Sequence, residues 1–161
     1  MQRPITGREF SATQKQAESR DGMTDLEKMQ QLLLTCPIWG DTLQVDITQP
    51  APGNVGLFPQ GLEERARRED VLGNVQVDCR YRFTLYRVAP QQDDGVDNAQ
   101  WLLDFQNWVL EQSAIGIAPQ FGDVPYLERI QASKGALKER GQTGIYTVSL
   151  VADFTRVYEH R

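Results

Sequence analysis

Histidine and cysteine are scarce in this sequence of 161 residues: His160 is its single histidine, and Cys36 and Cys79 are its two cysteines. One histidine and two separated cysteines cannot supply the ligands of a zinc site. His160 lies beside the C-terminus, where few neighbours can hold a general base in position. We therefore expect no catalytic residues, no metal site and no cofactor, and predict that the chain is not an enzyme.

Long hydrophobic runs are also missing. No uninterrupted apolar run exceeds three residues, as at Leu32–Leu34, so we expect no membrane span. The N-terminus lacks the apolar core of a secretory signal, and we expect a reducing compartment. In such a compartment, Cys36 and Cys79 are expected to be two buried thiols and not a disulfide.

Positive charge is in the minority. The chain has 17 Lys and Arg against 22 Asp and Glu, which makes its net charge −5. A general nucleic-acid binder neutralises phosphates with basic side chains, so this balance speaks against direct nucleic-acid binding.

The most regular pattern in the sequence covers residues 75–88. Apolar side chains occupy every odd position from Val75 to Leu85, and polar ones every even position from Gln76 to Thr84. A period of two predicts a long strand with one buried face and one face in water. Arg80 and Arg82 lie on the polar face.

The clearest helix is predicted over residues 98–112, where large apolar side chains recur on one side. They are Trp101, Leu102, Phe105, Trp108 and Val109. This stripe is expected to cover the apolar face of the 75–88 strand.

A first helix is predicted from the capping box Thr24–Glu27 to Cys36, where Pro37 ends it. Further strands are predicted over residues 42–48, 55–58, 127–138 and 145–158, the last two joined by a turn at 141–144. Residues 62–70 carry dense charges of both signs and are expected to form an exposed helical turn or a loop.

No strand–helix–strand repeat is present, so we predict an α+β fold: a single antiparallel sheet with two helices packed on one face. Residues 1–22 are polar and expected to be flexible. Residues 23–161 are expected to form a single α+β domain, a size sufficient for a real core.

The candidate subunit interface consists of arginines. The first group is Arg80 and Arg82 on the polar face of the long strand. The second lies in the mixed-charge segment and comprises Arg65, Arg67 and Arg68. This second group is expected either to be a solvated surface or to form ion pairs with a neighbouring subunit.

From Leu32 to Glu159 the chain resembles tail-terminator-like and minor capsid proteins from prophages and tailed phages of Gram-positive bacteria. The resemblance is carried by the order and spacing of several segments. They are Leu-Leu-Leu-Thr-Cys-Pro at 32–37, the strand at 77–87, the helix at 103–112, the loop with Pro119 and Gly122, and the strand at 144–159.

The resemblance implies a non-enzymatic subunit with a tail-terminator-like fold that forms a ring, often a hexamer, at the end of the tail tube. It implies as partners further copies of the chain and the phage tail tube and neck proteins. It places the protein in the cytoplasm of the bacterial host during assembly and in the virion tail afterwards.

Two alternatives remain open from the residues alone. One is a small-molecule or peptide-binding module with a pocket between the 98–112 helix and the sheet, closed by the loop at 114–125. The weaker one is an enzyme, for which the sequence offers no nucleophile–base pair.

Overall fold

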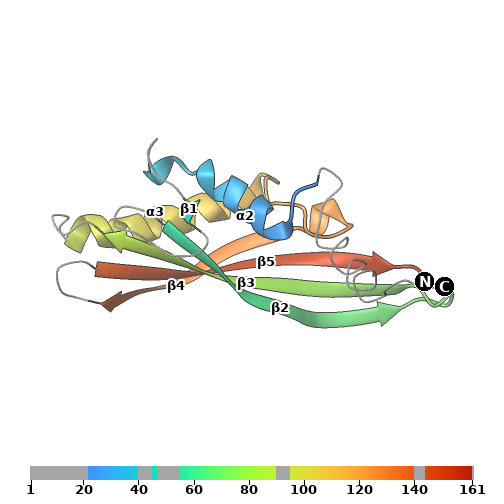
Figure 1. Ribbon diagram of the computed structural model, residues 1–161. Helices are drawn as coiled ribbons and strands as arrows, with labels where there is room; N and C mark the ends of the chain where they lie inside the picture. The colour runs from blue at the N-terminus through green and yellow to red at the C-terminus, as the bar shows by residue number, and fades with distance from the viewer. Residues whose placement is uncertain (1–21, 40–44, 47–54, 90–94, 140–143, 161) are drawn as a thin grey trace.

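The computed structural model describes residues 22–39, 45–46, 55–89, 95–139 and 144–160. These residues form a long twisted sheet with two helices on one face (Figure 1). The sheet has the strand order β1-β2-β3-β5-β4. The predicted α+β fold, with one antiparallel sheet and two helices, is confirmed.

Four long strands make up most of the sheet. They are β2 (Val55–Glu69), β3 (Val75–Ala89), β4 (Arg129–Glu139) and β5 (Gly144–Tyr158). Within this group of four, each strand pairs antiparallel with its neighbours. The two-residue strand β1 (Val45–Asp46) adds to the edge of β2 in the parallel direction, and the rest of the strand predicted at 42–48 lies outside the described residues.

The alternation in β3 matches the structure. Val77, Cys79, Phe83 and Leu85 are buried, whereas Arg82, between two of them, is exposed. On β5, Val148, Leu150 and Phe154 are buried on the same face. The two central strands, β3 and β5, therefore supply the sheet side of the hydrophobic core.

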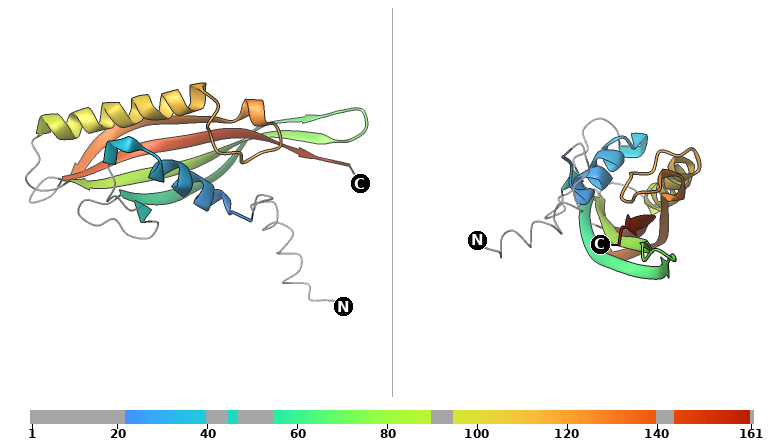
Figure 2. Two further views of the ribbon diagram at one scale, coloured as in Figure 1. Left: turned by 90° about the horizontal axis from the view of Figure 1, so that it is seen from above. Right: turned by 90° about the vertical axis from the view of Figure 1, so that its right-hand side faces the viewer.

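The two helices are α2 (Asp25–Leu34) and α3 (Gly95–Ala114). Both lie over the same face of the sheet, side by side along its length (Figure 2). Thr24 caps α2, because its hydroxyl oxygen accepts from the Glu27 amide at 3.2 Å. This capped start was predicted, and α2 ends at Leu34, before Pro37, which opens a single 3-10 turn, η1 (Pro37–Trp39).

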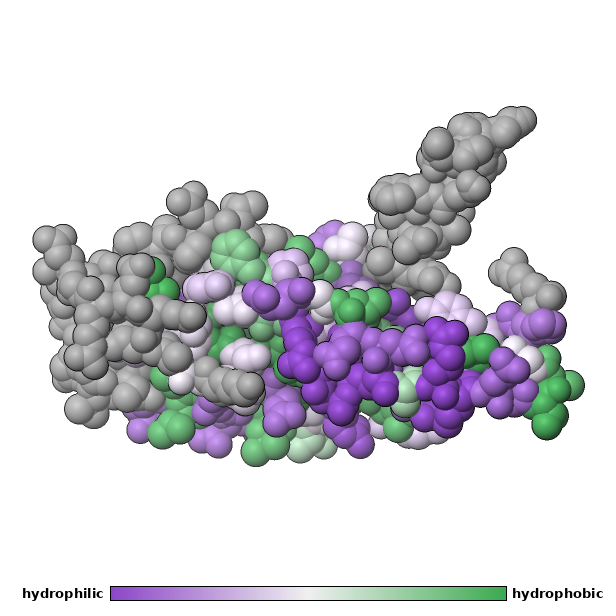
Figure 3. All heavy atoms as spheres, turned by 90° about the horizontal axis from the view of Figure 1, so that it is seen from below, coloured by the Kyte–Doolittle hydropathy of each residue, from purple (hydrophilic) through white to green (hydrophobic). Residues whose placement is uncertain are grey.

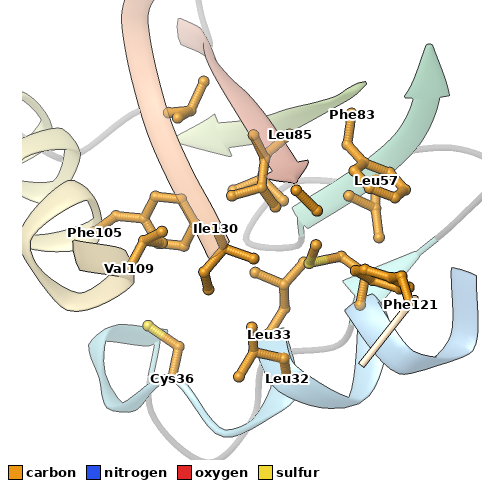
Figure 4. Packing of buried hydrophobic residues seen from close by; sticks show 14 of the residues in the cluster. Leu32, Leu33, Cys36, Leu57, Phe83, Leu85, Phe105, Val109, Phe121 and Ile130 are labelled. Atoms are coloured by element: carbon orange, nitrogen blue, oxygen red, sulfur yellow. The ribbon is translucent and has the colours of Figure 1, made fainter. Parts of the chain in front are cut away.

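The core lies between the helices and the sheet (Figure 4). Phe105 and Val109 of α3 are fully buried and lie near Ile130 of β4. Leu33 of α2 is fully buried as well. Full burial of each such side chain contributes roughly 1.5–3 kcal/mol before the entropy of ordering is subtracted. The predicted cover of the sheet by the 98–112 helix is confirmed, and α2 shares that role.

The prediction for residues 62–70 is wrong, since β2 runs without interruption from Val55 to Glu69. Two extra residues on β2, Gln60 and Arg65, shift its register against β3 and so break the two-residue period. From Pro59 to Glu69 every β2 residue except Ala66 is exposed. A strand that is exposed on both faces has no alternation of apolar and polar residues. For this reason the sequence pattern did not predict this part of β2.

The last two strands follow the prediction closely. The 127–138 strand appears as β4, preceded by the short 3-10 turn η2 (Pro125–Leu127), and it pairs antiparallel with β5 as expected. The turn predicted at 141–144 and the segment predicted to be flexible at 1–22 fall almost entirely outside the described residues.

Candidate interaction surface

On the face of the sheet opposite the helices, hydrophilic side chains gather near the centre and toward the hairpin of β2 and β3, with apolar residues among them (Figure 3). The centre of this face is an ion pair between Arg80 on β3 and Asp153 on β5, which are directly opposite in the register. Arg80 Nε lies 2.7 Å from Asp153 Oδ1, and Nη2 lies 3.0 Å from Oδ2. The Arg80 side chain is 19% exposed, so this pair is half-buried.

Arg82 and Arg68 form similar links from β3 and β2. Arg82 Nε lies 3.0 Å from Glu63 Oε2, at the surface. The two terminal nitrogens of Arg68 each lie 2.9 Å from an oxygen of Asp78, which also accepts a hydrogen bond from Thr155 on β5. The hydrogen bond from Arg68 is the main reason why the pKa of Asp78 lies below its usual value.

The other two candidate arginines differ in position. Arg65 is the extra residue of the second bulge, and its guanidinium reaches Asp153 at 3.8 Å. Arg67 lies on the opposite face, because its register partner is the buried Val77, and it forms an ion pair with Glu64 at 2.7 Å. The structure therefore brings Arg65, Arg68, Arg80 and Arg82 to one face and separates Arg67 from them.

All five arginines have a carboxylate partner within the chain. Exposed ion pairs of this kind contribute about 0–1 kcal/mol each, so their stabilising effect is small. They instead hold long side chains in fixed positions and balance the charge. Such a face can offer shape and directed hydrogen bonds to another protein, but it carries no strong positive patch.

A hollow of about 450 Å³ lies on this face, at the base of the hairpin formed by β2 and β3. Its walls carry the ion pairs of Arg65 and Arg68 with Asp153 and Asp78. Ala66 and Leu127 add apolar surface to it. The hollow is thus on the side of the sheet away from both helices.

The alternative prediction places a pocket between the 98–112 helix and the sheet. Large side chains of the core pack in that region. Trp101, Phe105 and Val109 are buried on the sheet side of α3. The rings of Trp101 and Phe105 stack with centroids 5.7 Å apart. Among the described residues, these side chains occupy the space that the alternative assigned to a ligand.

A buried polar network, which the sequence did not predict, fastens α2 to the sheet. Arg156 of β5 lies 3.0 Å from the Asp25 carboxylate, and the Tyr81 hydroxyl of β3 donates to the same carboxylate. Burial, followed by the hydrogen bond to Asp25, raises the pKa of Tyr81 to about 12. The network thus links α2 to β3 and β5, three elements that are distant in the sequence.

Glu128 forms a second buried link, in the loop between η2 and β4. Its two carboxylate oxygens accept from the amides of Phe121 and Gly122 at 3.0 and 2.9 Å. Burial raises the pKa of this carboxyl, and the two amides oppose that rise. Glu128 therefore shapes the loop that precedes it.

Neither link was visible in the sequence, since their members come from distant segments: Asp25 and Arg156 are 131 positions apart. Even the capping role of Thr24 gave no hint that its neighbour Asp25 faces the sheet. The one available signal was a charged residue, Arg156, inside the alternating pattern of β5 at a position that should be apolar.

The two cysteines and the single histidine were the other residues considered for chemistry. Cys36 and Cys79 are free and buried, as predicted. His160 follows the end of β5, and its amide donates to the Asn74 side chain at 2.9 Å. Within the described ranges, no three His, Cys, Asp or Glu side chains are grouped to hold a metal ion.

In the same part of the chain, no helix is both long and apolar enough to cross a membrane. The sequence matches no known protein-family model, and comparison with curated proteins gives no significant match.

Proposed function

We propose that this protein is a non-enzymatic structural subunit of a phage or prophage virion, a tail-terminator or tail-completion protein that assembles into a ring at the end of the tail tube. The observation that carries the proposal is the face of the sheet that lies away from both described helices. It is long, polar and held in place by cross-strand ion pairs such as Arg80–Asp153. A face of this kind suits contact with another folded protein.

The fold supports the proposal because nearly all large side chains of the core serve to join the helices to the sheet. The surface of the described residues includes an extended sheet face, the outward side of α3 and a projecting hairpin of β2 and β3 (Figure 1). In a closed ring, each subunit meets its neighbours through two different patches, so one chain must offer two surfaces. The sheet face, the hairpin and the outward side of α3 are three candidates for these two surfaces.

The resemblance from Leu32 to Glu159 supplies the biological setting of the proposal. Under it, the partners are further copies of the chain, often six, and the tail tube and neck proteins of the virion. The protein would act in the bacterial cytoplasm during assembly and remain in the virion tail, with no direct contact to nucleic acid or membrane.

The experiment is a co-assembly assay with the tail tube protein of the phage or prophage to which the proposal assigns this chain. The full chain is mixed with preformed tubes, which are then sedimented and imaged by negative-stain electron microscopy. We expect the chain to sediment with the tubes and to appear as a ring at one tube end. Tubes that stay uncapped, with the chain left in the supernatant, would contradict the proposal.

The hollow at the base of the hairpin favours a second candidate function, a small-molecule or peptide-binding module. Its arginine and aspartate walls would suit a ligand that carries both charges. A thermal-shift screen with amino acids and short peptides tests this candidate. A saturable rise in melting temperature that is lost in the Arg65→Ser variant would support it.

A further inference from the structure

The turn between β2 and β3 presents two aliphatic side chains to water. We call residues 70–74 the hairpin tip. Within it Val71 is fully exposed and Leu72 is 73% exposed. The tip lies at the free end of the sheet, beyond both helices, where hydrophobic surface is seen in Figure 3. Aliphatic residues at so exposed a position are available to anchor a partner.

The tip is a well-bonded turn. The Asp70 carboxylate accepts from the amides of Leu72 and Asn74 at 2.8 and 2.9 Å and from the Asn74 side chain at 3.0 Å. Gly73 has a φ of +86°, which favours glycine, and its amide donates to the Asp70 carbonyl. Because these bonds already order the turn, little conformational entropy is lost when it binds.

The segment after β5 adds a further restraint. The His160 amide donates to the Asn74 side chain, and a Cβ atom on Gly73 would come within 2.9 Å of the His160 ring. The tip is therefore held from both its own strands and the end of the chain. A turn with this many restraints keeps Val71 and Leu72 pointed into solvent.

A second exposed apolar surface lies on the outward side of α3. Leu103 and Leu110 are 55% and 66% exposed and are seven residues apart, so they share one side of the helix. Ile115 and Ile117, which follow the end of the helix, are exposed as well. The buried residues Phe105 and Val109 lie on the other side, against the sheet.

The tip and the outward side of α3 do not meet within one copy. The tip projects from one end of the sheet, whereas α3 begins at the other end and lies over that half (Figures 1 and 2). Of the ten large hydrophobic residues that are exposed in the described part of the chain, six lie at the tip or from α3 through Ile117. If the tip and the outward side of α3 cover each other, the contact must join two copies.

Arginines next to the tip can reach acidic residues of α3, although Glu69 and Asp70 balance their charge within the hairpin. Over residues 100–114 the only charged residues are Asp104 and Glu111, each next to one of the two leucines and exposed. Arg67 and Arg68 lie close to the tip, with 59% and 53% of their side chains exposed. Both have a carboxylate partner in their own chain, and a guanidinium has five N–H donors, so each can bind a second carboxylate.

We propose that the hairpin tip of one copy docks on the outward side of α3 of the next copy, with Val71 and Leu72 packed against Leu103 and Leu110. This inference rests on the proposed function, for which it names the contact between ring neighbours. Because each copy has one tip and one α3, the contact is head-to-tail and is satisfied in every subunit of a closed ring.

The test is a pair of cysteines, Leu72→Cys and Leu110→Cys, placed in one chain and oxidised mildly. The native Cys36 and Cys79 are buried and give little background. We expect a ladder of covalent multimers on a denaturing gel from the double variant. Either single variant can link at most two chains, and it serves as the matched control.

A double variant that gives no species beyond the dimer, from a wild-type chain that forms rings, would overturn this inference and leave the proposed function standing. If the wild-type chain forms no ring, alone or on tail tubes, and the double variant gives no ladder, both the docking contact and the proposed function are contradicted. A ladder that grows without limit and without rings would support the contact and contradict the ring.

A second variant removes the anchor without adding a bond. Val71→Ser with Leu72→Ser is expected to raise the concentration for half-assembly by roughly tenfold or more. Leu62→Ser is the control, since Leu62 is 53% exposed elsewhere on β2 and should leave assembly unchanged. Unchanged assembly of the tip variant would contradict the inference. Loss of its binding to tail tubes in that case would assign the tip to the tube protein.

Discussion

Arg80 on β3 and Asp153 on β5 form a two-point ion pair across the centre of the sheet, with N–O distances of 2.7 and 3.0 Å. Arg82, two residues along the same strand, is paired with Glu63 and leaves 45% of its side chain exposed. The two arginines that the sequence marked as one interface therefore have different roles. Arg80 mainly joins strands, and Arg82 is open to a partner.

Replacing both arginines, Arg80→Ser with Arg82→Ser, should leave the fold intact and weaken assembly. Of the single changes, Arg80→Ser should lower the free energy of unfolding more, by about 1 kcal/mol, because it leaves the half-buried Asp153 with only Arg65. Arg82→Ser should cost only a few tenths of a kcal/mol, as is typical of exposed pairs.

Urea unfolding followed by circular dichroism gives the free energies, and sedimentation velocity gives the extent of assembly. The control is Arg129→Ser, also on the polar face but bonded only to nearby carbonyl groups. An unfolded double variant would show that the pair is essential to the sheet. Full assembly by a folded double variant would remove these arginines from the interface.

Alkaline pH should destabilise the fold through Tyr81. Its pKa is about 12 in the folded chain and near 10 when exposed, so the folded state keeps the proton that the unfolded state loses. The stabilisation from this group is complete below pH 10 and disappears as the pH rises from 10 to 12. Tyr81→Phe should lower stability at neutral pH and flatten this part of the pH profile.

Chemical denaturation of both proteins between pH 8 and 12 checks this prediction. Tyr126→Phe is the matched control, because it removes the same hydroxyl from a tyrosine that is exposed at the surface. Parallel profiles for the wild type and Tyr81→Phe would show that the link between Tyr81 and Asp25 does not shift the titration.

Gly122→Ala should destabilise the chain by about 1–3 kcal/mol, since a Cβ atom there would lie 2.2 Å from the Thr155 carbonyl oxygen. The loop could move away only by giving up the bonds of Glu128 to Phe121 and Gly122. Gly135→Ala is the control, as its Cβ would meet only the flexible end of Leu102 at 3.1 Å. Thermal unfolding of the two variants should rank them in that order, and equal melting temperatures would refute the close approach.

The thiols should be inert in the folded protein. Burial raises the pKa of Cys36 to about 11, and it raises the pKa of Cys79 too. At pH 8 we expect an aromatic disulfide reagent to label neither thiol in native buffer and both in guanidinium chloride. Rapid labelling of Cys36 in native buffer would show that the region around η1 opens readily.

The predictable parts of the fold are the elements that have one buried face and one solvent-exposed face. The hydrophobic periodicity of the sequence predicts β3, β5 and the buried side of α3, because burial selects apolar residues at a fixed spacing. The distal half of β2 could not be predicted in this way, since it is exposed on both faces and its two bulges shift the pattern.

The candidate surface was predictable only in part. The even positions of β3 placed Arg80 and Arg82 on the polar face, but their partners depend on the strand register, which no local pattern reveals. Arg67 was grouped with Arg68 by proximity in sequence, although adjacent strand residues face opposite sides. The exposed hairpin tip could not be recognised until residues 62–70 were known to be a strand.

The central claim is that this chain is a subunit of a closed ring, and the most direct measurement is its mass in solution over a wide concentration range, with images of the same samples. The account predicts a discrete multiple of the 18.3 kDa chain, six copies under the resemblance, and ring-shaped particles. A strictly monomeric mass at every concentration, with no rings in the images even after addition of tail tubes, would contradict it.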